Sequence, residues 1–310
     1  MMLCLSACDG IIYKDLDPCE LMISYKYDYN LLEADAFASQ VKRVDLFIFD
    51  EKGLSVASPI RVEGDPFEKG FSHSLNLVPG TYTFVAWAGL YDKSYSISNI
   101  KDLDAMRVSI NNTKQISDKA LDHLWHGIVS KVEVKGLPNE HIVIPLIKDT
   151  NTFKINLVTT TNQETFDAGA YSIEIVSTNE VMDGYNELVP NRPITYLPYL
   201  SEINSNVDIE GTKYVGLSYE LRTGRLFAKN NDKIIIRDMS TNKIVGRPID
   251  MNTYINLYRL SFHQGMPLQE YMDRQDQYVI TFMFNFEHPN FDALTIAING
   301  WIIREHSDNL

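Results

Sequence analysis

Residues 41–50 read VKRVDLFIFD, and this stretch decides the fold class. In an extended chain Leu46 and Ile48 lie on one face, whereas Phe47 and Phe49 lie on the other. A strand that is apolar on both faces is covered on both sides, as the central strands of packed sheets are. We therefore expect a buried central strand of a β-sandwich, followed by a hairpin loop that contains glycine.

Short alternating segments separated by turn residues continue along the chain. Residues 74–90 read SLNLVPGTYTFVAWAGL, and Pro79 and Gly80 fit the central positions of a type II turn, so we expect a hairpin. This unit recurs in transthyretin-like sandwiches. The segment 186–210 carries three prolines and is expected to be a loop. Further strands are expected at residues 128–134, 141–147, 153–158, 171–177, 233–238, 254–260, 278–286 and 294–303.

Two short helices are expected between the strands. Ser117 suits an N-cap, and Leu121 and Trp125 lie four residues apart on one face, which predicts a helix over residues 117–127. The sequence PLQEYMDRQ predicts a second helix over residues 267–275, because proline is favoured at the first helical position.

Length and composition set the domain organisation. The 310 residues include 28 Lys and Arg against 41 Asp and Glu, for a net charge of -13. At about 150 residues per domain, this length favours two domains. We expect a mainly β fold of two transthyretin-like β-sandwich domains, each with a short helix, at residues 21–150 and 151–310, after a signal remnant and tether at residues 1–20. The acidic balance argues against nucleic acid as a partner.

The three cysteines all lie near the N-terminus, at Cys4, Cys8 and Cys19. Residues 5–8 read LSAC, which resembles a bacterial lipobox, so Cys8 is expected to carry the lipid and Cys4 to belong to the leader. Two or three acyl chains anchor a protein firmly without a spanning helix. The basic residues and the 7–15 apolar residues of a signal peptide are missing before the lipobox, which puts the start codon in question. The alternative is a cytosolic protein with a fortuitous cysteine.

Motifs for catalysis and metal binding are absent from the sequence. It has no G-x-S-x-G, H-E-x-x-H, P-loop or Rossmann fingerprint. His123 and His126 lack a third ligand nearby, and core or capping roles suit them better than zinc binding. Six acidic or amide residues could offer oxygens to calcium, but none follows a known loop spacing. These are Asp15, Asp17, Asp28, Asn230, Asn231 and Asp232. We therefore expect no enzyme, no metal and no cofactor, although scattered serines or carboxylates leave a hydrolase open.

Several segments together resemble one family, the FimB-type fimbrillin-associated anchor and minor subunit lipoproteins of Gram-negative anaerobes. The segments that carry the resemblance are LSAC with YKDL and PC near the N-terminus, then YDYN, ADAF, VDLFIFD, PGTY, AWAG, LWHG, QEY and the terminal INGW. The resemblance implies an outer-membrane lipoprotein at the base of a fimbrium (pilus), which tethers the fimbrium to the cell and limits its length. Its implied partners are fimbrillin-like subunits, joined by strand donation.

The C-terminal stretch LTIAINGWIIR is the candidate partner-binding strand. Leu294, Ile296 and Ile298 share one face, Gly300 is expected to mark a bulge, and Trp301 supplies bulk. The alternative is an ordinary core strand. The sequence does not decide whether this strand is donated or retained.

The leading function is a lipid-anchored fimbrial anchor or minor subunit, which is not an enzyme. The alternative is a surface glycan-binding lipoprotein, because aromatic residues make up 11% of the chain and exposed ones could stack on sugars. The tyrosines considered for this role are Tyr91, Tyr95, Tyr196 and Tyr199.

Overall fold

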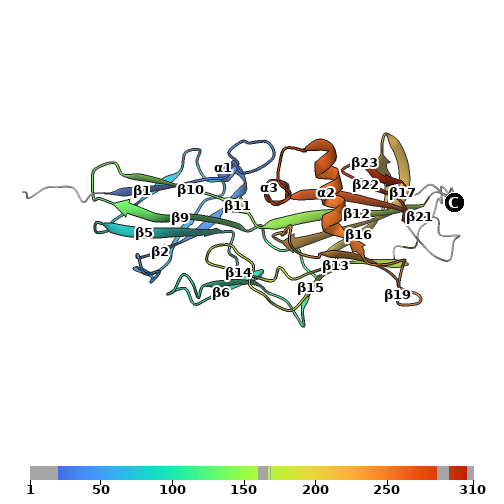
Figure 1. Ribbon diagram of the computed structural model, residues 1–310, viewed down its shortest axis with the longest axis horizontal. Coiled ribbons are helices and arrows are strands. Elements are labelled where there is room, and N and C mark those ends of the chain that lie inside the picture. Colours follow the sequence, from blue (N-terminus) through green and yellow to red (C-terminus); the bar gives the residue numbers. More distant parts are fainter. Residues whose placement is uncertain (1–19, 160–166, 168, 285–292, 306–310) are drawn as a thin grey trace, which may run out of the picture.

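The computed structural model describes residues 20–159, 167, 169–284 and 293–305, and this part of the chain is mainly β, as the sequence predicts (Figure 1). Its helices are α1 (Phe37–Gln40), α2 (Met251–Phe262) and α3 (Leu268–Arg274). The strands of the first half are β1 (Leu21–Lys26), β2 (Arg43–Phe49), β3 (Ile60–Glu63), β4 (Ser72–Leu75), β5 (Gly80–Ala88), β6 (Tyr95–Ser98), β7 (Arg107–Ile110), β8 (Ile116–Ser117), β9 (Trp125–Val134), β10 (His141–Pro145) and β11 (Ile147–Lys148).

The strands of the second half form longer ladders. They are β12 (Thr150–Thr159), β13 (Tyr171–Ser177), β14 (Val181–Asp183), β15 (Ile194–Tyr196), β16 (Leu200–Ile209), β17 (Thr212–Gly224), β18 (Lys233–Asp238), β19 (Lys243–Ile244), β20 (Ile249–Asp250), β21 (Gln277–Phe284), β22 (Ala293–Ile298) and β23 (Trp301–Glu305). They build a six-stranded sheet in the order β16-β17-β12-β21-β22-β23, which packs against a second sheet in the order β19-β18-β13-β15-β8.

The strand β2 lies between two hydrophobic cores. Its sheet, in the order β11-β9-β5-β2-β3, packs Leu46 and Ile48 against the small sheet β10-β1-β4. Phe47 and Phe49, on the opposite face, belong to a second core that continues into the other half of the chain. All residues of β2 are buried, so the prediction of a strand covered on both faces is confirmed.

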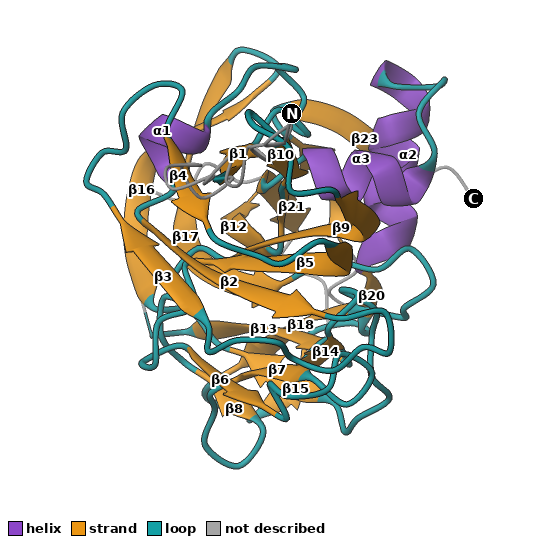
Figure 2. Cartoon of the chain, turned by 90° about the vertical axis from the view of Figure 1, so that its left-hand side faces the viewer, coloured by secondary structure: helices purple, strands orange, loops and turns teal. Residues whose placement is uncertain are grey.

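The two halves of the chain share sheets. The strand β7 pairs with β14, and β8 pairs with β15, so strands from the first half extend sheets of the second half. Figure 2 shows these strands gathered on the side of the molecule away from α2 and α3. Because the two halves interlock, the boundary at residue 150 stays a prediction.

Residues 117–127 do not form the predicted helix. The chain leaves β8 at Ser117 and runs without helical structure to β9. Its backbone groups bond to other segments instead: the Asp149 N–H donates to the Leu124 carbonyl at 2.7 Å, and the Arg222 guanidinium donates to the Leu121 carbonyl. These tertiary bonds outweigh the local helical pattern, which is a weak preference on its own.

The predicted hairpin over residues 74–90 is also wrong. The strand β4 pairs with β1, whereas β5 pairs with β2 and β9, so Pro79 lies in a connection between two sheets. The alternating pattern marks both strands, but it carries no information on which strand each one pairs with.

Three further expectations for the second half need correction. The predicted strand at residues 254–260 is part of α2, which Asp250 caps by accepting from the Thr253 N–H at 2.9 Å. The predicted loop at residues 186–210 contains β15 and β16. Gly300 lies in a turn and not in a bulge, as described below. The second predicted helix is confirmed as α3, with Pro267 at its N-cap.

Candidate partner-binding site

The strand β22 holds most of the residues expected to bind a partner, and it is an inner strand. It pairs with β21 on one side and β23 on the other. Ile296 is 2% exposed and Ile298 is fully buried, so both pack in the core. The side chain of Leu294 lies outside the described residues. Only Trp301, which is 53% exposed, faces solvent.

A tight turn joins β22 to the edge strand β23. Asn299 and Gly300 have φ values of 50° and 85°, which is the arrangement of a two-residue hairpin turn. Asn299 is held in place by Val279, whose N–H donates to the Asn299 Oδ1 at 3.0 Å. The expected irregularity is present nearby, because the register between the two strands shifts beside Ile296.

Trp301 forms an exposed aromatic pair with Phe262. The two ring centroids are 5.4 Å apart, and Phe262, at the end of α2, is 44% exposed. Aromatic side chains in such positions are enriched where proteins bind one another. The pair therefore brings a residue from the helix and a residue from the edge strand to one surface.

The two edges of the six-stranded sheet differ in how open they are. At β23, the Ile302 N–H donates to the Glu210 carboxylate at 3.3 Å, so a side chain already occupies this edge. At the other edge, β16 pairs only with β17 among the described residues, and Leu200 and Ile203 are 42% and 51% exposed. Native proteins usually shield an edge of this length, because its free backbone groups can pair with another chain.

The open edge and Trp301 are neighbours at one end of the sheet. Glu210, in the turn after β16, donates its N–H to the Gly300 carbonyl at 3.1 Å. A strand that added to β16 would therefore reach the turn that presents Trp301. Sequence reasoning missed β16, because the three prolines before it favoured a loop.

The two histidines lie in different environments, because His126 is buried and His123 is half-buried. His126 is buried, its Nε2 lies 3.1 Å from the Gly184 carbonyl, and burial lowers its pKa to about 3. His123 Nδ1 lies 3.2 Å from the Thr150 Oγ1, and burial, helped by Lys148 and Arg222, lowers its pKa to about 3. Among the described residues, no three His, Cys, Asp or Glu side chains are grouped to hold a metal.

Two of the four tyrosines considered for sugar stacking are buried. Tyr95 and Tyr196 are 2% and 0% exposed, so their rings cannot reach a ligand. Tyr91 lies against the Arg43 guanidinium, 5.3 Å from ring centroid to Cζ, and Tyr199 lies against Arg222 at 6.0 Å. Of the four tyrosines considered for sugar stacking, only Tyr91 and Tyr199 therefore remain as candidates.

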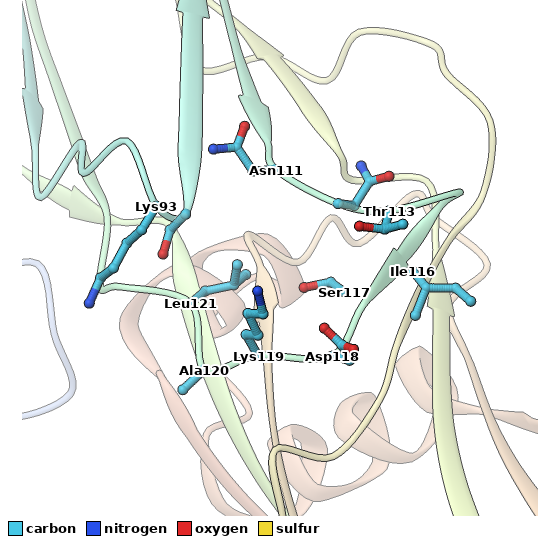
Figure 3. A pocket seen from close by; sticks show the side chains of 11 residues that line it. Lys93, Asn111, Thr113, Ile116, Ser117, Asp118, Lys119, Ala120 and Leu121 are labelled. Atoms are coloured by element: carbon cyan, nitrogen blue, oxygen red, sulfur yellow. The ribbon is translucent and has the colours of Figure 1, made fainter.

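A separate polar hollow lies beside β8 (Figure 3). It has a volume of about 390 Å³, and five of its eleven lining residues, 117–121, belong to the segment that was expected to be a helix. Among its lining residues are Asn111, Thr113, Ser117, Asp118, Lys119 and Leu121. The helical pattern did not predict this hollow, because a helix would have pointed these side chains in different directions.

The expected lipid site, Cys8, lies outside the described residues, as do Cys4 and Cys19. No helix in the described part of the chain is long and apolar enough to cross a membrane.

Comparisons with known proteins find a matching family model and several solved structures of similar fold. Residues 16–307 match the family model described as fimbrillin-A associated anchor proteins Mfa1 and Mfa2. A candidate polysaccharide-binding protein from Bacteroides thetaiotaomicron is 28% identical, with a TM-score of 0.80 over 94% of this chain and 100% of that chain. A candidate adhesin from the same organism is 24% identical, with a TM-score of 0.82 over 94% and 99%.

A more distant structure shares the fold. The fimbrial anchor protein Mfa2 from Porphyromonas gingivalis is 16% identical, with a TM-score of 0.72 over 93% of this chain and 100% of that chain. No curated protein matches the chain.

Proposed function

The chain belongs to the family of fimbrillin-A associated anchor proteins Mfa1 and Mfa2, and from this premise we propose that it tethers a fimbrium to the outer membrane as a lipid-anchored subunit. Cys8 carries the lipid, and the next fimbrial subunit binds at the open edge of the six-stranded sheet. The protein performs no catalysis in this role.

The observation that carries the proposal is the open edge strand β16 in a chain of this family. Seven of its ten residues are exposed, and Ile203 presents an apolar side chain there. A partner strand would gain backbone hydrogen bonds along β16, and its side chains would fit against alternate residues. Since Glu210 contacts Gly300, the same partner would reach Trp301. Ile296 and Ile298 would then support the binding surface from the core, and Leu294 belongs to the same strand.

The anchoring half is tested by expressing the full reading frame in a bacterium that attaches lipids to exported proteins. Wild-type protein is expected to take up labelled fatty acid and to sediment with outer membranes. Cys8→Ala should abolish the label and release the protein. Cys19→Ala is the matched control and should keep both properties. A wild-type protein that takes up no label would refute lipid anchoring at Cys8.

The subunit-binding half is tested with a charge on the open edge. Ile203→Lys places an ammonium group where a partner strand would pack, and such charges block edge-to-edge pairing. Capture of fimbrial subunits should fall about tenfold or more, equivalent to about 1.4 kcal/mol. Val143→Lys is the control, since Val143 is 46% exposed on β10, an edge of a different sheet. Binding at β16 would be contradicted if both variants lost subunit capture equally, or if neither variant lost it.

A further inference from the structure

We propose that the polar hollow beside β8 binds a neutral saccharide unit. This inference goes beyond the anchoring function and does not depend on it. It rests on the unused polar groups of the hollow, on the strained turn that forms its wall, and on its charge balance.

Several polar side chains in the hollow have no partner within the described part of the chain. The Thr113 and Ser117 hydroxyls, the Asp118 carboxylate and the Lys119 ammonium make no hydrogen bond or ion pair there. The Asn111 amide donates to the Asp92 carbonyl at 2.7 Å, which leaves its oxygen free. Donors and acceptors thus lie together around one space, as the hydroxyl groups of a sugar require.

A strained turn fixes one wall of the hollow. Lys114 and Gln115 have φ values of 55° and 64°, and the flanking residues Thr113 and Ile116 exchange two backbone hydrogen bonds of 3.0 Å. This type of turn normally uses Asn and Gly, because both of its central residues need a positive φ. Asn112 secures the turn from behind by donating to the Glu180 carboxylate at 2.6 Å.

The charges around the hollow cancel. The Lys93 ammonium lies 2.9 Å from the Asp122 carboxylate, and Asp118 is followed directly by Lys119. In Figure 3 the amino group of Lys93 points away from the hollow, while that of Lys119 lies near Ser117 and Leu121 in this view. The unpaired Lys119 ammonium would attract an acidic sugar, but the adjacent unpaired Asp118 carboxylate would repel it, so the hollow offers an acidic sugar no net attraction and a neutral sugar fits better.

Apolar residues in the lining suit the C–H face of a sugar ring. Leu121 is 2% exposed, and Ile116 is 40% exposed at the rim. The volume of about 390 Å³ falls within the range of ligand sites, which begins near 300 Å³. Polar and apolar side chains around one space can recognise the hydroxyl groups and the ring carbons of a sugar together.

The test uses the full chain on an array of neutral, sialylated and uronic acid-containing glycans, followed by titration of the best binder. We expect binding to a neutral glycan, weakened about tenfold or more by Asp118→Ala and by Ser117→Ala. Asp118 is exposed and unpaired, so its variant should keep the wild-type thermal unfolding midpoint. Glu68→Ala, an exposed carboxylate outside the hollow, is the control and should bind as the wild type does.

Three outcomes would overturn the proposal. The first is the absence of binding to any neutral glycan at millimolar concentration. The second is a preference for acidic glycans. The third is neutral binding that survives Asp118→Ala and Ser117→Ala unchanged, which would locate the sugar elsewhere.

Discussion

The Asn186 Nδ2 donates a hydrogen bond of 2.9 Å to the Asp149 Oδ1, and Asp149 is 0% exposed. The other oxygens of both groups, Asp149 Oδ2 and Asn186 Oδ1, have no hydrogen-bond partner within the described residues. Burial raises the pKa of Asp149 to about 7, against the lowering effect of Arg225 and Asn186. Arg225 is itself paired mainly with Asp273, at 2.8 Å.

The first prediction concerns the pH dependence of stability. The pKa of Asp149 in the folded protein is above its value of about 3.9 in the unfolded chain. Protonated Asp149 therefore makes its full contribution to the free energy of unfolding when the pH is below about 3.9. This contribution is lost as pH rises from about 4 through about 7, where the unfolded chain releases this proton first. The loss is of the order of 2–4 kcal/mol in the free energy of unfolding. Asp149→Asn should remove this slope, because an amide can keep the bond from Asn186 without a charge.

Urea unfolding of both proteins between pH 4 and 8 checks this expectation. Burial also raises the pKa of Asp232 to about 6. Asp232 therefore contributes a pH dependence of the same sign to the stability of the wild type and of the variant. The difference between wild type and variant therefore isolates Asp149. Identical slopes would show that Asp149 is ionised in the folded protein throughout.

The second prediction concerns the buried ion pair of Lys148 and Asp276. The ammonium lies 2.5 Å from the Asp276 carboxylate and 5.3 Å from the centre of the Trp125 ring, and the Lys148 side chain is 4% exposed. Lys148→Ala should cost about 2–4 kcal/mol in unfolding free energy, because it leaves Asp276 without its partner. Asp276→Asn should lower the free energy of unfolding less in the Lys148→Ala variant than in the wild-type protein. Strict additivity in this double-mutant cycle would contradict direct coupling.

The third prediction concerns Gly89, which has a φ of 76° at the end of β5. A Cβ atom there would lie 2.0 Å from the His123 carbonyl oxygen, which belongs to the backbone. Gly89→Ala should destabilise the protein by about 3 kcal/mol or more. Gly70→Ala is the control, because Gly70 has a φ of 77° but no atom within 4 Å of its added Cβ. Its cost should be about 1 kcal/mol, from backbone strain alone. Similar melting points for the two variants would argue against the close contact at His123.

The fourth prediction follows from the proposed subunit contact. Trp301→Ala should lower the affinity for the fimbrial partner about tenfold or more, since exposed aromatic residues often dominate binding energy. The unfolding free energy should change by only about 1 kcal/mol, because the side chain is 53% exposed. Val78→Ala, at a position that is 73% exposed, is the control and should leave binding intact. Affinity that is unchanged in both would remove Trp301 from the interface.

Local patterns in the sequence identified many of the strands but not their partners. The burial of β2 followed from its apolar residues on both faces, whereas the pairing of β4 with β1 depends on contacts far along the chain. The helix α2 was missed although Asp250 offered a cap, because the segment that follows it also alternates in hydrophobicity. Trp301 as a contact residue stays a prediction from the sequence, whereas which strand forms the open edge is a property of sheet order.

The hollow was beyond sequence reasoning for a different reason. Ser117 and Leu121 carry a helical signature, yet their segment is irregular and is bonded to residues such as Arg222, which is distant in sequence. Only these long-range bonds turn Ser117 and Asp118 toward one space.

The parallel pairing of β1 with β10 decides how the molecule responds to mechanical tension. Met22 lies opposite His141 and Lys26 opposite Pro145, and the chain passes from the end of β10 into the second half. In the proposed role, a membrane tether would pull β1 at its start, and a fimbrium bound to the second half would pull β10 at its end. These opposed forces run along the two strands, so they shear all the bonds between them at once instead of peeling them one by one. Stretching a single molecule from its two ends should therefore give one abrupt rupture of this strand pair, and gradual extension at low force would contradict the shear geometry.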